Sequence, residues 1–208
     1  MLAIFDTEGV LIDGEFLPEL AKITGNEREI LEITNKGING EIKWEEGLLK
    51  RVNKLLGISY EECITTAAQL PIMNGAKETF VTLRKLGFTT LTVSGGPDIL
   101  VNRVKEELKI DYAFSNELIF KNGKLNGIDI KVNSKKDEVI RDVLKNINEK
   151  KENIVAIIDG ANDIGLFKIS GLKISFNGAK LINEKSDFLI KKKDLGEIIP
   201  IIREAFAL

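Results

Sequence analysis

Three short apolar segments, far apart along the chain, constrain the fold more than any other feature of the sequence. They are residues 2–5 (LAIF), 91–93 (LTV) and 154–158 (IVAII). Near-continuous apolar runs of this length are typical of parallel strands that are covered on both faces. Helical patterns separate them along the whole chain. This alternation predicts an α/β fold whose core is a doubly wound, Rossmann-like parallel sheet.

A reactive polar residue follows each apolar segment directly. These residues are Asp6, Ser94 and Asp159. The carboxyl ends of parallel strands lie at one edge of an open α/β sheet, and ligands bind there. We therefore expect the three side chains to meet at one site.

A long helical stretch lies between the first two predicted strands. Residues 16–24 and 61–70 have helical patterns, and no strand-like alternation interrupts residues 13–70. Five apolar residues also share one predicted helical stripe: Leu48, Leu49, Val52, Leu55 and Leu56. A segment of this length is too long for a connecting loop. We expect residues 13–70 to form a small helical cap domain, and residues 1–12 and 71–208 to form the core domain.

Two further elements are expected in the second half of the chain. Residues 118–120 and 125–130 flank Asn122 and Gly123, a pair that favours a two-residue β-hairpin turn. Apolar residues between 139 and 147 predict one amphipathic helix before the third strand. The basic residues 191–193 are expected in a solvated surface turn.

The composition excludes several kinds of chemistry. The chain has 208 residues, a net charge of −2, one cysteine (Cys63) and no histidine. It can form neither an internal disulfide nor a cysteine/histidine zinc site, and it lacks histidine acid/base chemistry. The charge balance does not predict binding to nucleic acid or to membranes. The first ten residues do not resemble a secretory signal, so we expect a cytoplasmic protein.

The first strand end offers two carboxylates on one tight loop. Asp6 ends the apolar segment, Glu8 follows two positions later, and Gly9 comes next. Such a pair can supply a nucleophile and a general acid/base. A strand that simply ends in polar residues has the same pattern, so this motif alone leaves both interpretations open.

The second predicted strand end is suited to bind an anion, and the third is suited to bind a cation. Ser94 and Gly95, in VSGGPD, lie where a strand meets a helix, and small residues there let backbone N–H groups approach an anion. An ordinary strand-to-helix turn would look similar. Asp159, Asn162 and Asp163, in IDGAND, provide the oxygen ligands that Mg²⁺ prefers, although carboxylates that cap a helix are the simpler alternative.

The combination of these motifs is far more specific than any one of them. The sequence contains, in this order, Asp6 and Glu8, then Ser94 with two glycines, Lys136, and Asp159 with Asn162 and Asp163. This order resembles that of the haloacid dehalogenase phosphatase superfamily over nearly the whole chain. The helical segment after the first motif, the SGG motif, the NG pair and the DGAND motif most resemble the phosphoserine phosphatase branch.

The resemblance implies a role for each matching residue. Asp6 would be the nucleophile and Glu8 the general acid/base. The phosphate would be bound by Ser94, Gly95, Lys136 and Asn162. Mg²⁺ would be held by Asp6, Asp159 and Asp163, with Glu8 contributing through its main-chain carbonyl. Lys136 fits the spacing to the following helix better than Lys135 does.

The predicted cap also contains two residues that match the family's substrate-binding positions. Glu15 would bind an ammonium group and Arg51 a carboxylate, so together they would recognise an amino acid backbone. For both residues, and for Arg51 in particular, a salt bridge on the protein surface is the alternative.

The first motif departs from the usual family pattern DxDx(T/S). Glu8 has one more methylene group than aspartate, and Gly9 and Val10 replace hydroxyl residues. The stretch DTEGVL also resembles the motif of phosphoserine:homoserine phosphotransferases. From the combined motifs, we expect a Mg²⁺-dependent phosphatase for phosphoserine or a similar small phosphomonoester, acting as a monomer or homodimer. A phosphotransferase and a weakly active binding protein are the alternatives.

Overall fold

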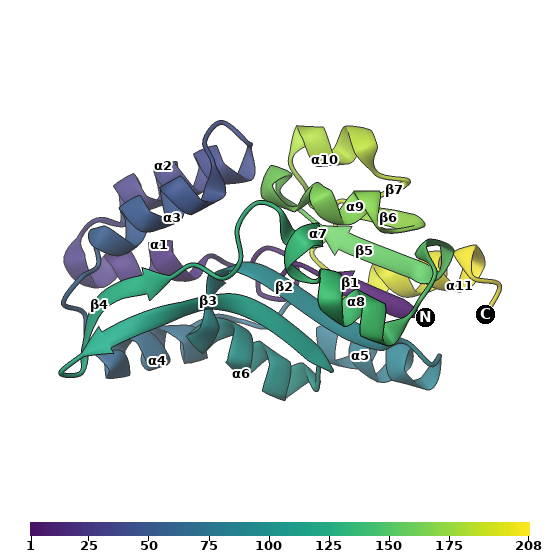
Figure 1. Ribbon diagram of the computed structural model, residues 1–208, viewed down its shortest axis with the longest axis horizontal. Helices are drawn as coiled ribbons and strands as arrows, with labels where there is room; N and C mark the ends of the chain where they lie inside the picture. Colours follow the sequence, from purple (N-terminus) through teal and green to yellow (C-terminus); the bar gives the residue numbers. More distant parts are fainter.

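The computed structural model describes residues 1–208 and is built around one seven-stranded sheet (Figure 1). Its strands are β1 Leu2–Phe5, β2 Thr89–Pro97, β3 Tyr112–Lys121, β4 Lys124–Asp129, β5 Ile154–Ile158, β6 Leu172–Phe176 and β7 Phe188–Ile190. The spatial order is β4-β3-β2-β1-β5-β6-β7. All neighbours are parallel except β3 and β4. The predicted α/β fold with a mostly parallel sheet is confirmed.

Helices cover both faces of the sheet. The α-helices are α1 Phe16–Leu20, α2 Glu27–Ile38, α3 Trp44–Asn53, α4 Tyr60–Gln69, α5 Ala76–Lys85, α6 Asp98–Leu108, α7 Lys136–Val139, α8 Arg141–Ile147, α9 Gly165–Lys168, α10 Lys180–Lys185 and α11 Ile198–Ala205. Short 3₁₀ helices are η1 Ala21–Thr24, η2 Lys151–Asn153, η3 Ala161–Asp163 and η4 Leu195–Glu197. No helix is long and apolar enough to cross a membrane.

The alternation of side chains along β1 explains why the core has two parts. Ala3 and Phe5 point into the larger apolar cluster, in which Phe5 packs against Phe80 of α5. Leu2 and Ile4 point into the smaller cluster on the opposite face. Successive side chains of a strand face opposite sides, so a strand buried on both faces must be apolar throughout. This places β1 in the middle of the sheet, with its last residue next to Asp6.

The expected helical insertion after the first strand is present. Helices α1, η1, α2, α3 and α4 form it, and α1 to α3 lie as a group alongside the β3–β4 end of the sheet (Figure 1). The backbone N–H of Asp13 donates to the carbonyl of Pro71, and Ile12 forms a β-bridge with Ile72. The insertion therefore leaves the core and returns to it at neighbouring points.

The β3–β4 hairpin connects the core to this insertion. Asn122 and Gly123 both have positive φ angles, 51° and 72°, as the predicted two-residue turn requires. The tip of the hairpin lies against the insertion, since the backbone N–H of Gly57 donates to Leu125 and that of Leu125 donates to Ile58. The hairpin is confirmed, and β3 is longer than the apolar pattern predicted.

Three details of the secondary structure were not predicted correctly. The stripe through the third helix is wrong in part, because α3 ends at Asn53 and the side chains of Leu49 and Leu56 are exposed. The single helix expected over residues 139–147 is two short helices, α7 and α8, that meet at the buried Ile140. Strands β6 and β7 were not expected. Residues 191–193 lie in an exposed loop, as predicted.

Candidate active site

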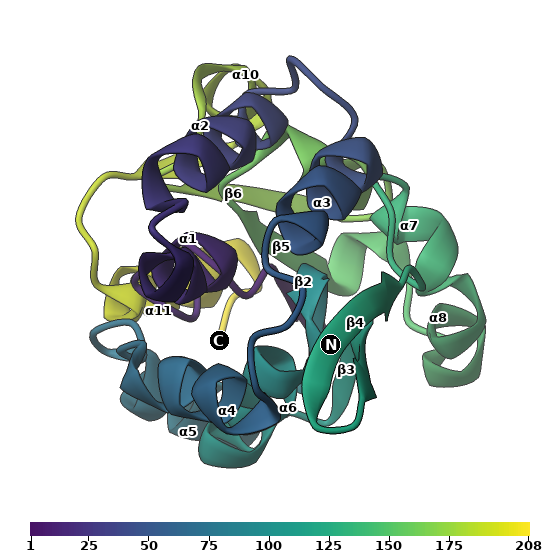
Figure 2. The same cartoon turned by 90° about the vertical axis from the view of Figure 1, so that its left-hand side faces the viewer.

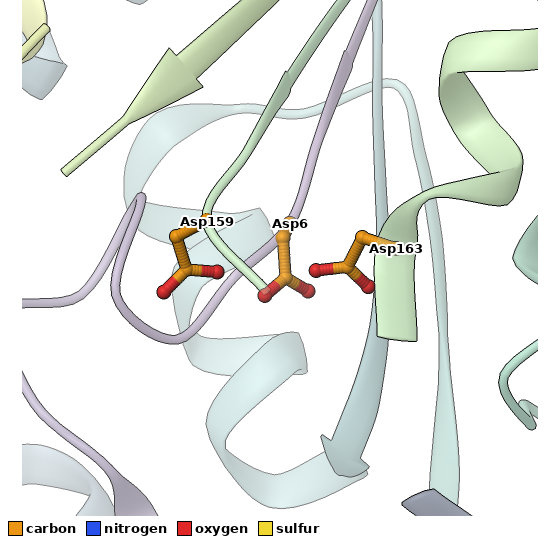
Figure 3. Close-up of side chains that lie close together, drawn as sticks. All are labelled: Asp6, Asp159 and Asp163. Carbon is orange, nitrogen blue, oxygen red and sulfur yellow. The ribbon is translucent and has the colours of Figure 1, made fainter. Parts of the chain in front are cut away.

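The ends of β1 and β5 bring three carboxylates together (Figure 3). Asp6 follows β1, Asp159 follows β5, and Asp163 ends the 3₁₀ helix η3. One carboxylate oxygen from each lies within 4.8 Å of the other two. β1 and β5 are adjacent and parallel, so the residues that follow them must lie side by side at this edge. The expected meeting of Asp6 and Asp159 is present in the structure.

Lys136 joins this cluster from the start of α7. Its side chain is only 1% exposed, and its Nζ donates to Asp6 Oδ1 at 2.6 Å and forms an ion pair with Asp163. Burial lowers the pKa of Lys136, but the charges of Asp163 and Asp6 outweigh this effect and raise the pKa above its ordinary value. Lys136 therefore carries a permanent positive charge inside the cluster. Lys135 is exposed and pairs with Glu138 at the surface.

The cluster has the properties of a site for a hard cation. Burial, together with repulsion from Asp6, raises the pKa of both Asp159 and Asp163. The buried oxygens Asp163 Oδ2 and Asn162 Oδ1 have no hydrogen-bond partner. Buried carboxylates without a partner are costly, and a divalent cation with oxygen ligands would remove this cost. The residues present fit Mg²⁺.

Glu8 lies beside the cluster but turns its carboxyl group toward the insertion. It is 8% exposed, and its Oε1 accepts a hydrogen bond of 2.6 Å from the backbone N–H of Phe16, the first residue of α1. Burial raises the pKa of Glu8 to about 7 despite this hydrogen bond. Near neutral pH the group can thus both give and take a proton, as a general acid/base must.

Two glycines make room for the acidic side chains. Gly9 has a φ of +77°, and a Cβ atom there would lie 2.1 Å from Asp159 Oδ2. A Cβ at Gly96 would lie 2.1 Å from Glu8 Oε2. Both contacts are far too short for any side chain. Gly9 departs from the usual family motif. The local geometry explains this residue, because it leaves no space for a side chain at position 9.

Ser94 and Gly95 form another wall of the site. Ser94 Oγ accepts a hydrogen bond of 3.0 Å from the backbone N–H of Gly96. Both residues line a narrow cavity with room for little more than one water molecule. The full lining is Asp6, Glu8, Glu15, Ile38, Trp44, Ser94, Gly95, Asp159 and Asn162. The cavity thus combines residues of the core with residues of the insertion.

The two expected substrate-binding residues have different positions. Glu15 lines the cavity, and burial, followed by repulsion from Glu8, raises its pKa well above the ordinary value. Arg51 is 2% exposed and is not at the surface. Its guanidinium donates to Thr34 Oγ1 at 2.9 Å and lies 4.4 Å from the centre of the Trp44 ring. Arg51 is close enough to influence the pKa of both Glu8 and Glu15.

Three residues at the site were not predicted: Ile38, which lines the cavity, Trp44 and Asn116. Trp44 lines the cavity from α3 and donates its indole N–H to the Gly95 carbonyl. Asn116 is fully buried in β3 and connects Gly95 with the backbone of Lys131 and Val132, which precede Lys136. A single tryptophan in a charged segment was the available signal for Trp44. No sequence signal marked Asn116, an asparagine within a strand.

Comparisons with known proteins agree with this geometry. The model of the haloacid dehalogenase-like hydrolases matches residues 1–171. The chain belongs to this family of hydrolases. A phosphoserine phosphatase of Methanocaldococcus jannaschii is 38% identical over 205 residues, which cover 97% of each chain. One of Campylobacter jejuni is 34% identical, covering 97% of this chain and 99% of the other.

Solved structures lead to the same branch of the family. A phospho-aspartyl intermediate analogue of a phosphoserine phosphatase has a TM-score of 0.93 and 37% identity, covering 96% of this chain and 97% of that chain. A substrate-bound phosphoserine phosphatase has a TM-score of 0.92 and 36% identity with the same coverage. Within the family, the chain is a phosphoserine phosphatase-like hydrolase.

Proposed function

We propose that this chain is a Mg²⁺-dependent phosphatase that hydrolyses phosphoserine, or a similar small amino acid phosphate, through a phosphorylated Asp6. The observation that carries this proposal is the position of Asp6. Its carboxylate follows the central strand, lies beside two further aspartates and contacts the buried Lys136. This arrangement combines a nucleophile with the positive charge that a transferring phosphoryl group needs.

Asp6, Asp159 and Asp163 would hold the cation, together with the main-chain carbonyl of Glu8. When bound, Mg²⁺ would neutralise charge on the phosphoryl oxygens. Ser94, Gly95, Lys136 and Asn162 would bind these oxygens. Lys136 is already in contact with Asp6, so its charge is in place where the phosphoryl group would be transferred.

In the first step, an Asp6 carboxylate oxygen attacks phosphorus and the ester P–O bond breaks. Glu8 gives its proton to the departing alkoxide oxygen, and Asp6 now carries the phosphoryl group. The pKa of Glu8, raised to about 7 by burial, supports this role because the group is still partly protonated at neutral pH.

In the second step, Glu8 takes a proton from a water molecule, which attacks phosphorus. The bond between phosphorus and the Asp6 oxygen breaks, inorganic phosphate leaves, and Asp6 is restored. Lys136 stabilises the negative charge in both steps.

Residues 13–70 would act as the cap that closes over this reaction and selects the substrate. The cavity is narrow and includes Glu15, Ile38 and Trp44 of this segment, so a substrate can enter only when the segment moves away. The nearby Glu15 and Arg51 would recognise the ammonium and carboxylate groups of an amino acid. The phosphoserine phosphatases among the relatives support this choice. We propose a cytoplasmic enzyme that acts as a monomer or homodimer.

One observation favours a second candidate, transfer of the phosphoryl group to an amino alcohol such as homoserine. Glu8 reaches past the position of an aspartate and is held by Phe16 N–H of the cap segment. An acid/base held in this way could activate an alcohol in place of water.

A panel of phosphomonoesters, tested with Mg²⁺ and with a chelator, examines both candidates. We expect Mg²⁺-dependent release of phosphate, fastest from phosphoserine. Formation of phosphohomoserine after addition of homoserine would favour the transferase. Absence of phosphate release from every ester would contradict the proposed function.

A further inference from the structure

Trp44 lies where the insertion meets the core. It is the only tryptophan of the chain, the first residue of α3, and only 6% exposed. Its indole N–H donates a hydrogen bond of 2.9 Å to the carbonyl of Gly95. Helix α3 belongs to the insertion and Gly95 to strand β2 of the core, and these two elements are neighbours (Figure 2). The bond therefore joins the two parts of the molecule.

The surroundings of the ring are shaped to hold it in this place. A Cβ atom at Gly95 would lie 2.1 Å from the indole nitrogen, and one at Gly37 of α2 would lie 2.9 Å from Cε3 of the ring. The Arg51 guanidinium lies 4.4 Å from the ring centre and adds a cation–π contact. Two glycines and one cation therefore fix the direction in which the indole N–H points.

The acceptor of this bond belongs to the peptide group that also contacts Ser94. The Gly95 carbonyl accepts from Trp44 and, at 2.9 Å, from Asn116 Nδ2. The N–H of the same peptide group is that of Gly96, and it donates to Ser94 Oγ at 3.0 Å. Because a peptide group is rigid and planar, fixing its carbonyl also fixes its N–H. Ser94 Oγ accepts at this position, so its own proton remains available for an oxygen in the cavity.

We propose that Trp44 is a positioning residue that fixes the Gly95–Gly96 peptide group when the cap closes, and through it the hydroxyl of Ser94. Asn116 holds the same carbonyl from within the core and does so whether the cap is open or closed. Trp44 adds the second donor only in the closed form. Closure of the cap therefore completes the phosphate-binding side of the site. This inference rests on the proposed role of Ser94 in binding phosphate and on the proposed movement of residues 13–70 as a cap.

The indole N–H can be observed directly because the chain has one tryptophan. In ¹⁵N-labelled protein it gives a single indole signal, whose exchange with solvent reports opening of the cap. We expect Mg²⁺ with inorganic phosphate to slow this exchange at least tenfold. An exchange rate that phosphate leaves unchanged would overturn the link between the bond and closure. This measurement needs binding of phosphate but no turnover, so it can be made even if the protein hydrolyses no ester.

The hydrogen bond can also be removed without changing the shape of the ring. Growth of a tryptophan auxotroph on β-(3-benzothienyl)alanine replaces the N–H of this one residue with sulfur. We expect kcat/KM for phosphoserine to fall about five- to tenfold while the melting temperature falls by no more than about 4 °C. Trp44→Phe is a second variant that lacks the N–H and should show a similar loss. Full activity of the benzothienyl protein would overturn the proposal.

A double-mutant cycle tests whether Trp44 acts through Ser94. We expect the benzothienyl substitution to lower kcat/KM much less in a Ser94→Ala background than in the unmodified protein. In an Asn162→Ala background, which leaves the Gly95–Gly96 peptide group untouched, its cost should be unchanged. Equal costs in all three backgrounds would show that Trp44 does not position Ser94. Absence of any ester hydrolysis would remove the proposed function and leave the exchange measurement to decide the role of the bond.

Discussion

At the scale of single residues, the glutamate at position 8, where the usual family motif has aspartate, matters most for catalysis. Its carboxyl group is buried, bonded to Phe16 N–H, and has a pKa of about 7. An aspartate is one methylene shorter and would not place its carboxyl group at the same point. A displacement of about 1 Å at a reacting group can cost roughly 100-fold in rate. The neighbourhood of Glu8, including Gly96, is shaped for the longer side chain.

We predict that Glu8→Gln lowers kcat by about 10²- to 10⁴-fold with a much smaller change in KM. Glutamine keeps the size and can still accept from Phe16 N–H, but it has no proton to give to the leaving group. Steady-state kinetics on phosphoserine measures the two constants. Glu8→Asp is the matched control and should retain part of the activity. A Glu8→Gln variant as active as the unmodified protein would remove Glu8 from its role.

Gly9 provides a second prediction, on binding of the cation. Gly9→Ala would place a methyl group on Asp159 Oδ2 and also strain a backbone with φ of +77°. We expect the Mg²⁺ concentration that gives half-maximal activity to rise about tenfold or more. Gly87→Ala is the control, because its φ is +79° and no atom lies within 4 Å of its Cβ position. Equal Mg²⁺ dependence of the two variants would show that Asp159 is not disturbed.

At the scale of secondary-structure elements, α4 stabilises the connection between the insertion and the core. Ser59 and Glu62 form a capping box at its start: the Glu62 N–H donates to Ser59 Oγ at 3.2 Å, and the Ser59 N–H donates to Glu62 Oε2 at 2.7 Å. The helix contacts α6 of the core, and Ser59 also forms a bridge with Lys124 at the hairpin tip. This helix start therefore anchors the cap segment to the β3–β4 hairpin.

We predict that Ser59→Ala lowers the free energy of unfolding by about 1 kcal/mol, the usual contribution of such a cap. Urea denaturation measures the change. Because Ser59 is remote from the aspartate cluster, kcat should stay within about twofold. Thr65→Ala, on the exposed side of the same helix, should leave the stability nearly unchanged. A loss of the same size in both variants would contradict a specific role of the cap.

At the scale of the whole molecule, the buried carboxyl groups link stability to pH and to the cation. Burial raises the pKa of Glu8 and of Asp163 to about 7, and it raises that of Asp159 as well. In the unfolded chain these groups titrate near pH 4. Between about pH 4 and pH 7 the folded state therefore binds more protons than the unfolded state. Stability falls as pH rises through this window.

Without a divalent cation, we predict that the free energy of unfolding decreases between pH 5 and pH 7. Mg²⁺ at about 100 times its Kd should add about 2.7 kcal/mol at neutral pH, because it binds only the folded cluster. Urea denaturation over this pH range, with chelator and with Mg²⁺, measures both effects. Asp163→Asn should flatten the pH dependence. A free energy that increases from pH 5 to pH 7 in the presence of chelator would contradict this prediction.

Much of this architecture could be predicted from the chain. The apolar segments at residues 2–5 and 154–158 predicted the central strands, because a strand buried on both faces has no room for polar side chains. The order of the strand ends predicted that Asp6 and Asp159 would meet. The Asn122–Gly123 pair predicted its turn through the positive φ angles that only a few residues tolerate.

The limits of the sequence appear where contacts between distant segments decide the structure. Periodicity placed Leu49 and Leu56 on a buried stripe, although both are exposed, because a pattern cannot tell which neighbours will cover a helix. Only the tertiary structure showed that Glu8 turns toward α1, that Gly9 leaves room for Asp159 and that Trp44 reaches Gly95. The sequence by itself determined which residue types could do the chemistry and at which strand ends they lie. The packing of the cap segment on the core decided their directions, distances and pKa values, because these depend on residues brought together only by folding.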